Sequence, residues 1–204
     1  MSNRIRPELP RLPKRIARLP VGKRGYPVPW FVARFDGEPD FRVYDSGKLI
    51  KACQERRCWV CGEALGAFNY FVLSPVCAVN RTSTEPPCHE DCAEFSAKAC
   101  PFLTRPTMHR RTAGLPEETF EAAGIVFDSS PGVVLVWATL TYEIVRAAKG
   151  VEFKIGEPVN CRWFAEGRSA TREDVLASID SLFPSAGLKA GEAERLMRLF
   201  ESKA

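Results

Sequence analysis

Histidine is scarce in this chain of 204 residues, which contains only two, His89 and His109. Long apolar runs are also missing: the longest, residues 132–138, falls far short of the ~18 residues that a membrane-spanning helix needs. Neither a P-loop nor a G-x-G-x-x-G motif is present. These absences argue against a membrane span and against the nucleotide-binding sites that these two motifs mark. They also leave His109 as the single neutral-pH base if His89 holds a metal ion.

The composition is that of a folded protein. Hydrophobic residues make up 45% and charged residues 26% of the chain, which excludes wholesale disorder. A chain of this length forms one good-sized domain or two small ones. The net charge of +4 is uneven, because residues 1–24 carry eight basic side chains and one acid, whereas the other 180 residues carry 21 basic and 24 acidic side chains. The N-terminal segment therefore holds all of the excess positive charge.

The N-terminal segment, residues 1–24, also contains Pro7, Pro10, Pro13 and Pro20, which forbid a long helix. We interpret it as a flexible, basic arm. It has no apolar core of a secretory signal, so a cytoplasmic protein is expected. Such an arm suits nucleic acid or an acidic protein surface, and a second basic cluster follows the cysteine-rich region. The candidate binding residues are Arg11, Lys14, Arg15, Arg18, Lys23, Arg24, Arg105, Arg110 and Arg111.

The remaining chain predicts an α+β protein in two parts. Residues 25–110 read as a zinc-binding module with an N-terminal hairpin, and residues 111–204 read as a small antiparallel sheet with two C-terminal helices. In the first part we expect a hairpin over residues 28–44, a helix over 48–57 and a second hairpin over 67–79. In the second part we expect one long strand over 133–145 with a bend or bulge, strands over 151–155 and 159–164, and helices over 170–183 and 192–202.

The cysteine spacing predicts a metal site. Cys58 and Cys61 form a C-x2-C-G knuckle, and His89 and Cys92 form an H-x2-C pair after a further 27 residues. Zn²⁺ prefers four such ligands in a tetrahedron, and residues i and i+3 in the first turn of a helix share a face. A knuckle, a hairpin and a helix carrying the second pair make a treble-clef-like module. With all four positions filled by protein, the zinc is expected to be structural and to supply folding energy of about 10 kcal/mol.

Other cysteines leave alternatives open. Cys88 can replace His89 as a ligand, because it stands four residues before Cys92, but neighbours on a helix point about 100° apart, so only one of the two is expected to bind. Cys77 is a reserve ligand, and an iron–sulfur cluster that uses Cys77 or Cys88 is a further alternative. Cys100 follows Cys92 by eight residues, about 12 Å along a helix, too far for the same ion.

Several stretches resemble a family of uncharacterised bacterial and phage-associated proteins. The resemblance covers most of residues 25–183 and implies little about activity. Members of that family often have serine where this chain has Cys88, which implies that His89 is the ligand. The stretches that carry the resemblance are PVPWFV (27–32), DGEPDFRV (36–43), CWVCG (58–62), PPCHEDCA (86–93), CPFL (100–103) and WFAEGRSATRE (163–173).

Three functions are compatible with these patterns. The first is a zinc-stabilised, non-enzymatic binding protein that contacts nucleic acid through the basic arm. The second is a phage or mobile-element protein that binds a host protein complex. The third, a metal-dependent hydrolase, is disfavoured because the extra histidines of ββα-metal nucleases are missing and the deaminase signature H-x-E…P-C-x-x-C appears in reverse order. No catalytic residue is assigned, and an enzymatic role stays open.

Overall fold

The computed structural model describes residues 4–106, 108–109, 111, 113–115, 130–148, 150–186 and 190–202. Its elements follow a mixed order of strands and helices, as the α+β prediction requires. They are η1 (Ile16–Arg18), β1 (Val32–Phe35), β2 (Glu38–Tyr44), α1 (Ser46–Glu55), β3 (Asn69–Leu73), α2 (Pro75–Asn80), β4 (Thr82–Ser83), α3 (Glu90–Ala99), α4 (Pro101–Thr104), β5 (Val133–Thr139), β6 (Tyr142–Ala147), β7 (Gly150–Ile155), β8 (Asn160–Ala165), β9 (Arg168–Ser169), α5 (Arg172–Ala186) and α6 (Ala190–Glu201).

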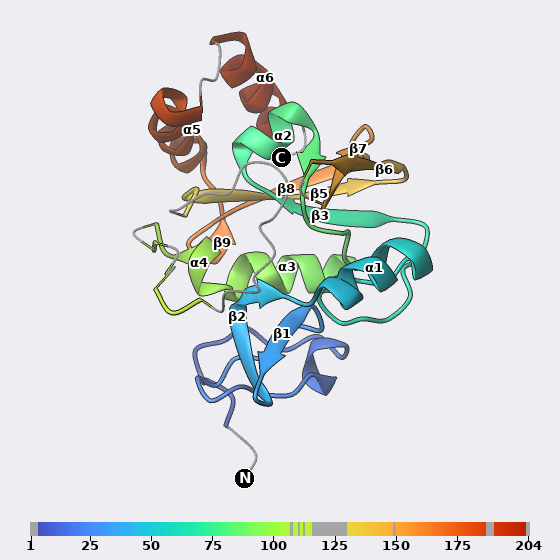
Figure 1. Ribbon diagram of the computed structural model, residues 1–204. Coiled ribbons are helices and arrows are strands. Elements are labelled where there is room, and N and C mark those ends of the chain that lie inside the picture. The colour runs from blue at the N-terminus through green and yellow to red at the C-terminus, as the bar shows by residue number, and fades with distance from the viewer. Residues whose placement is uncertain are drawn as a thin grey trace.

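The strands form small antiparallel sheets. β1 pairs with β2, a four-stranded sheet has the order β3-β5-β8-β9, and a three-stranded sheet has the order β4-β7-β6. Figure 1 shows the four-stranded sheet as a middle layer, with α2, α5 and α6 above it, α3 below it, and the β1–β2 hairpin below α3. The α+β class with small antiparallel sheets and C-terminal helices is therefore confirmed.

β5 is the central strand of this architecture, and all seven of its residues are buried. Alternate side chains of a strand point to opposite faces. Leu135 and Trp137 enter the core under α2, α5 and α6, whereas Val134 and Val136 enter the core that includes α3 and the cysteine knuckle. A strand covered on both faces must be apolar throughout, which explains the continuous apolar run in the sequence.

Two element predictions are wrong. The segment expected as a second hairpin, residues 67–79, is strand β3 followed by helix α2. Ser74 caps that helix by accepting a hydrogen bond from the Cys77 N–H, and Pro75 occupies its first turn, where proline is favoured. The segment expected as one long strand, 133–145, is divided between β5 and β6, which belong to different sheets.

The boundary expected at residue 110 does not separate two sheets. β3, from the first part, pairs with β5, from the second, over the register Asn69↔Thr139 to Leu73↔Leu135. β4 likewise pairs with β7. The cysteine-rich region and the C-terminal region therefore share their sheets.

The expectation of a free arm is also wrong for residues 4–24. Ile16 is only 1% exposed and lies in the buried cluster that contains Cys58 and Cys92. Arg15 forms ion pairs with Glu63 and Asp91. The prolines prevent a long helix, as the sequence suggests, but the segment packs on the globular part through Ile16 and the partly buried Leu9, Leu12 and Leu19.

Candidate metal centre

Two short segments bring four metal-binding side chains together. Cys58 and Cys61 lie in the turn after α1, His89 is the N-cap residue of α3, and Cys92 lies in the first turn of that helix. One ligand atom from each residue lies within 4.8 Å of the ligand atom of every other. The structure thus groups the four residues that the spacing predicts.

Backbone amides hold the Cys58 sulfur in place. The N–H groups of Cys61 and His89 donate to Cys58 Sγ, at 3.5 and 3.4 Å. Gly62 closes the knuckle with a φ of +77° and donates its N–H to the Cys58 carbonyl at 2.8 Å. A Cβ at position 62 would lie 2.6 Å from the Trp30 ring. Glycine is therefore required here by both the backbone angle and the neighbouring indole.

The His89 imidazole is oriented for ligation through Nδ1. That atom lies 3.4 Å from Cys61 Sγ, on the metal-facing side. On the far side, Nε2 lies 3.0 Å from the Ala64 carbonyl oxygen. A carbonyl can only accept, so this contact places a proton on Nε2, and in the neutral imidazole Nδ1 then carries the free lone pair. Such an outer hydrogen bond is typical of metal-bound histidine.

The dimensions fit a zinc ion. With Zn–S bonds of about 2.3 Å and a Zn–N bond of about 2.0 Å, neighbouring ligand atoms of a tetrahedron lie about 3.5–3.8 Å apart. The 3.4 Å contact between Cys61 Sγ and His89 Nδ1 is close to this geometry, and every other pair of ligand atoms lies within 4.8 Å. These four residues would hold the ion, and zinc would supply a cross-link between the knuckle and α3.

The charges of the site also match a divalent cation. Hydrogen bonds from Cys61 and the neighbouring cysteines lower the pKa of the Cys58 thiol. The Cys58 sulfur in turn raises the pKa of Cys61 to about 12 and raises the pKa of Cys92. Without a bound cation, the surrounding groups therefore favour the thiolate form of Cys58 and disfavour the thiolate forms of Cys61 and Cys92. A bound Zn²⁺ removes this opposition, because it deprotonates coordinating thiols.

Cys88 lies beside the centre but is not one of the four grouped residues. Its backbone pairs with Tyr70 of β3 through two hydrogen bonds of 3.1 and 2.7 Å. Its thiol is buried, and the Cys58 sulfur and burial raise its pKa. The alternative that uses Cys88 in place of His89 is thus not the arrangement that the structure brings together.

The other cysteines lie elsewhere in the fold. Cys77 is on α2 and, with Cys53 of α1, packs against the core on the other face of the sheet. Cys161 is a buried residue of β8, and Cys100 stands at the junction of α3 and α4. Within the described ranges, the Cys58–Cys61–His89–Cys92 group is the single His/Cys/Asp/Glu cluster close enough to hold an ion.

The end of α3 that carries the ligands is tied to the sheet and to the N-terminal segment. Arg162 of β8 donates to Glu90 at 2.7 Å and also contacts Glu94. Arg15 joins Asp91 of α3 to Glu63 of the knuckle, at 3.2 and 3.1 Å. The sequence did not predict that Arg15 connects the two ligand-bearing segments, because its partners are distant in the chain and no local pattern indicates these ion pairs.

The candidate binding residues of the basic segments divide into two groups. Arg15, Arg18 and Lys23 form ion pairs with acids of the protein. The second group is exposed and makes no ion pair with any residue that the structure describes. It comprises Arg11, Lys14, Arg24, Arg105 and Arg111. Arg110 lies outside the described residues.

Comparison with protein-family models, with curated proteins and with solved structures returned no match. No helix in the described part of the chain has the length and apolar character needed to cross a membrane. The centre is therefore interpreted from its own geometry: four protein ligands surround one position, as in structural zinc sites.

Proposed function

We propose that this protein is a non-enzymatic binding protein that is stabilised by one structural zinc ion and contacts nucleic acid through a basic surface. The observation that carries the structural role is the complete set of four protein ligands around one position. A catalytic zinc keeps one position open for water or substrate. The succession of a knuckle and a helix that carries the second ligand pair supports a treble-clef-like description of the module.

The basic surface rests on the group of exposed arginines and lysines without ion pairs. The two basic segments lie near each other: the pKa of Glu8 is lowered first by its backbone hydrogen bond and by Arg6, and the charge of Arg105 adds to this effect. Exposed cations that form no close ion pair can neutralise phosphates and release counterions.

Fluorescence anisotropy with generic DNA and RNA tests this proposal. Because residues 4–24 pack into the fold, substitution is preferable to truncation. The test variant carries Arg11→Gln, Lys14→Gln, Arg24→Gln and Arg105→Gln. For duplex DNA, each lost phosphate contact should reduce the slope of log K against log salt by about 0.9, so this variant should bind more weakly and with a shallower salt dependence.

A control variant replaces two exposed, ion-paired arginines at the opposite end of the molecule. Arg172 and Arg198 lie on α5 and α6, far from the N-terminus in Figure 1, and their side chains are 57% and 68% exposed. Arg172→Gln/Arg198→Gln should leave binding unchanged. Absence of binding at low salt would remove nucleic acid as the ligand and make an acidic protein surface the next candidate.

A further inference from the structure

Phe41 of β2 carries an aromatic ring that is only partly covered by the fold. Its side chain is 45% exposed. One edge of the ring meets the N-terminal segment, because a Cβ added to Gly22 would lie 3.5 and 3.6 Å from two of its ring carbons. The ring is therefore packed against the protein at that edge, while the rest of it is accessible to solvent. Phe35, which ends β1 in the same hairpin, is 36% exposed.

An exposed cation of the N-terminal segment lies near this ring. Arg24 follows the glycine that touches the ring, Gly22, by two residues, and it is exposed. The pKa of Asp40, which directly precedes Phe41, is lowered mainly by a hydrogen bond from Arg42, and the charge of Arg24 adds to this effect. Both observations place Arg24 beside β2.

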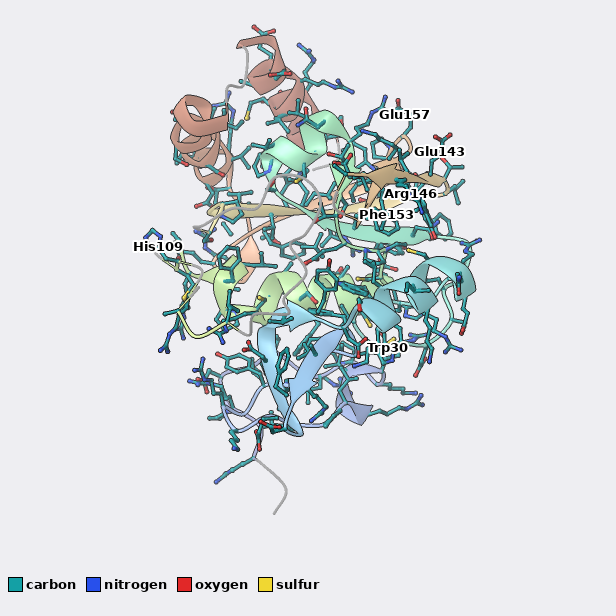
Figure 2. All side chains as sticks on the ribbon, in the orientation of Figure 1. Trp30, His109, Glu143, Arg146, Phe153 and Glu157 are labelled. Carbon is teal, nitrogen blue, oxygen red and sulfur yellow. The ribbon has the colours of Figure 1, made fainter. Side chains whose placement is uncertain are left out.

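The second basic segment reaches the same hairpin. The Arg42 guanidinium donates to the carbonyl oxygens of Arg111, Ala113 and Gly114, at 3.5, 2.9 and 3.2 Å. Arg111 is exposed, and Figure 2 shows His109 of this segment at the outer margin of the molecule. Three segments that are distant in the chain, two of them basic, therefore meet at β2.

The acids of this surface are mostly neutralised by near neighbours. Glu38 pairs with Lys23 at 2.9 Å, and Asp40 pairs with Arg42 at 2.6 Å. Asp36, in the turn of the hairpin, is a further exposed acid. Three exposed arginines stand outside these two ion pairs and outweigh it: Arg24, Arg34 and Arg111. The surface around Phe41 is therefore positively charged.

An accessible aromatic ring among cations fits a single-stranded nucleic acid, whose bases stack on the ring while its phosphates approach the cations. In a duplex the base faces are covered by the neighbouring base pairs, so the ring has no face to stack on. We propose that the surface around β1 and β2 binds single-stranded nucleic acid, with a base stacked on Phe41 and phosphates held by Arg24 and Arg111. This inference rests on the proposed nucleic-acid binding and narrows its ligand to single strands.

Fluorescence anisotropy on the zinc-loaded protein tests the stacking, with a labelled oligothymidine as the single strand and a duplex of the same length. Phe41→Leu should weaken binding of the single strand by about 5- to 100-fold and leave duplex binding unchanged. It should not alter the slope of log K against log salt, because no phosphate contact is lost. Arg24→Gln/Arg111→Gln should instead reduce the single-strand slope by about 0.7 for each lost contact.

Two control variants separate stacking from a general effect on the fold. Phe41→Tyr keeps an aromatic face and should retain the single-strand affinity. Phe68→Leu is the matched control, because it makes the same change at a ring that is 49% exposed but lines a hollow with Glu90 and Glu94. It should leave binding of both nucleic acids unchanged.

The outcomes distinguish this inference from the proposed function. Single-strand binding that Phe41→Leu leaves unchanged would overturn the stacking, although the basic surface would still bind phosphates. Equal weakening of single-strand and duplex binding by Phe41→Leu would overturn it as well, because the ring would then support the surface instead of a base. Absence of binding of either nucleic acid to the wild type at low salt would remove the proposed function itself, and the inference with it.

Discussion

Ile16 offers the sharpest test of whether the N-terminal segment packs into the core. Shortening an isoleucine side chain to alanine lowers the free energy of unfolding when the residue is buried, but has little effect when it lies on a free arm. Ile16 is 1% exposed and belongs to the buried cluster that includes Trp59 and Cys92. Replacing a buried isoleucine with alanine lowers the free energy of unfolding by about 2–5 kcal/mol, through lost burial and the cavity that remains. Ile16→Ala should therefore destabilise the zinc-loaded protein by an amount within this range.

Urea denaturation, followed by tryptophan fluorescence at a fixed free zinc concentration, measures this loss. Trp59 is a suitable probe, because it is buried beside the knuckle and stacks on Phe31 at a ring distance of 4.9 Å. Ile5→Ala is the matched control: the same change in the same segment, at a side chain that is 38% exposed, should stay within about 0.5 kcal/mol of the wild type. If Ile16→Ala and Ile5→Ala both changed the free energy of unfolding by similar, small amounts, the packing of the segment into the core would be refuted.

Two further predictions concern the knuckle and a surface carboxylate. Gly62→Ala should lower the free energy of unfolding by about 2–4 kcal/mol, because the alanine would need a positive φ and its Cβ would lie 2.6 Å from the Trp30 ring. It should also weaken zinc binding, measured by competition with a chelator. An unchanged zinc affinity would contradict this role of the glycine. The pKa of Asp174 is lowered, first by its hydrogen bonds with Arg168, so its stabilising effect is complete above the unfolded pKa of about 3.9 and declines as pH falls below it. Asp174→Asn should therefore be less stable than the wild type at neutral pH, and urea midpoints should show this difference shrinking in acid; a difference that is constant with pH would exclude the ion pair as its cause.

The metal ligands could be predicted from the sequence because they are residue types that bind metal ions and each pair lies within four consecutive residues. Cys58 and Cys61 stand at the spacing of a knuckle, and His89 and Cys92 stand at the spacing of a helical turn. The resemblance already favoured His89 over Cys88, and the fold agrees: the Cys88 backbone bridges to Tyr70, and Cys88 is not one of the four grouped residues.

Long-range contacts account for what the sequence could not reveal. The N-terminal segment has the composition of a solvated tail, yet Arg15 reaches Glu63, 48 residues away. At the break between β5 and β6, the Thr139 hydroxyl oxygen accepts from the Thr141 N–H and lies 3.1 and 3.0 Å from the carbonyl oxygens of Thr141 and Glu157, to either of which its single proton can be donated. Contacts between residues so far apart in the chain can be identified only once the arrangement of the sheets is known.

The α2 helix is a different case, because its start signal was present in the sequence. Ser74 and Pro75 are a favoured N-cap and first-turn residue. The alternating apolar residues around them also fit a strand, and a helix of six residues is too short for its periodicity to decide. The burial of Val76 and Val79 against β5 and α6 settles the competition in favour of the helix.

X-ray absorption at the zinc edge of the purified protein tests the central claim most directly. The account predicts one zinc per chain with three sulfur ligands at about 2.3 Å and one nitrogen ligand at about 2.0 Å, from Cys58, Cys61, Cys92 and His89. Four sulfur ligands would show that Cys88 replaces His89. A bound water oxygen would show an open site, and a folded protein without zinc would contradict the structural role of the metal.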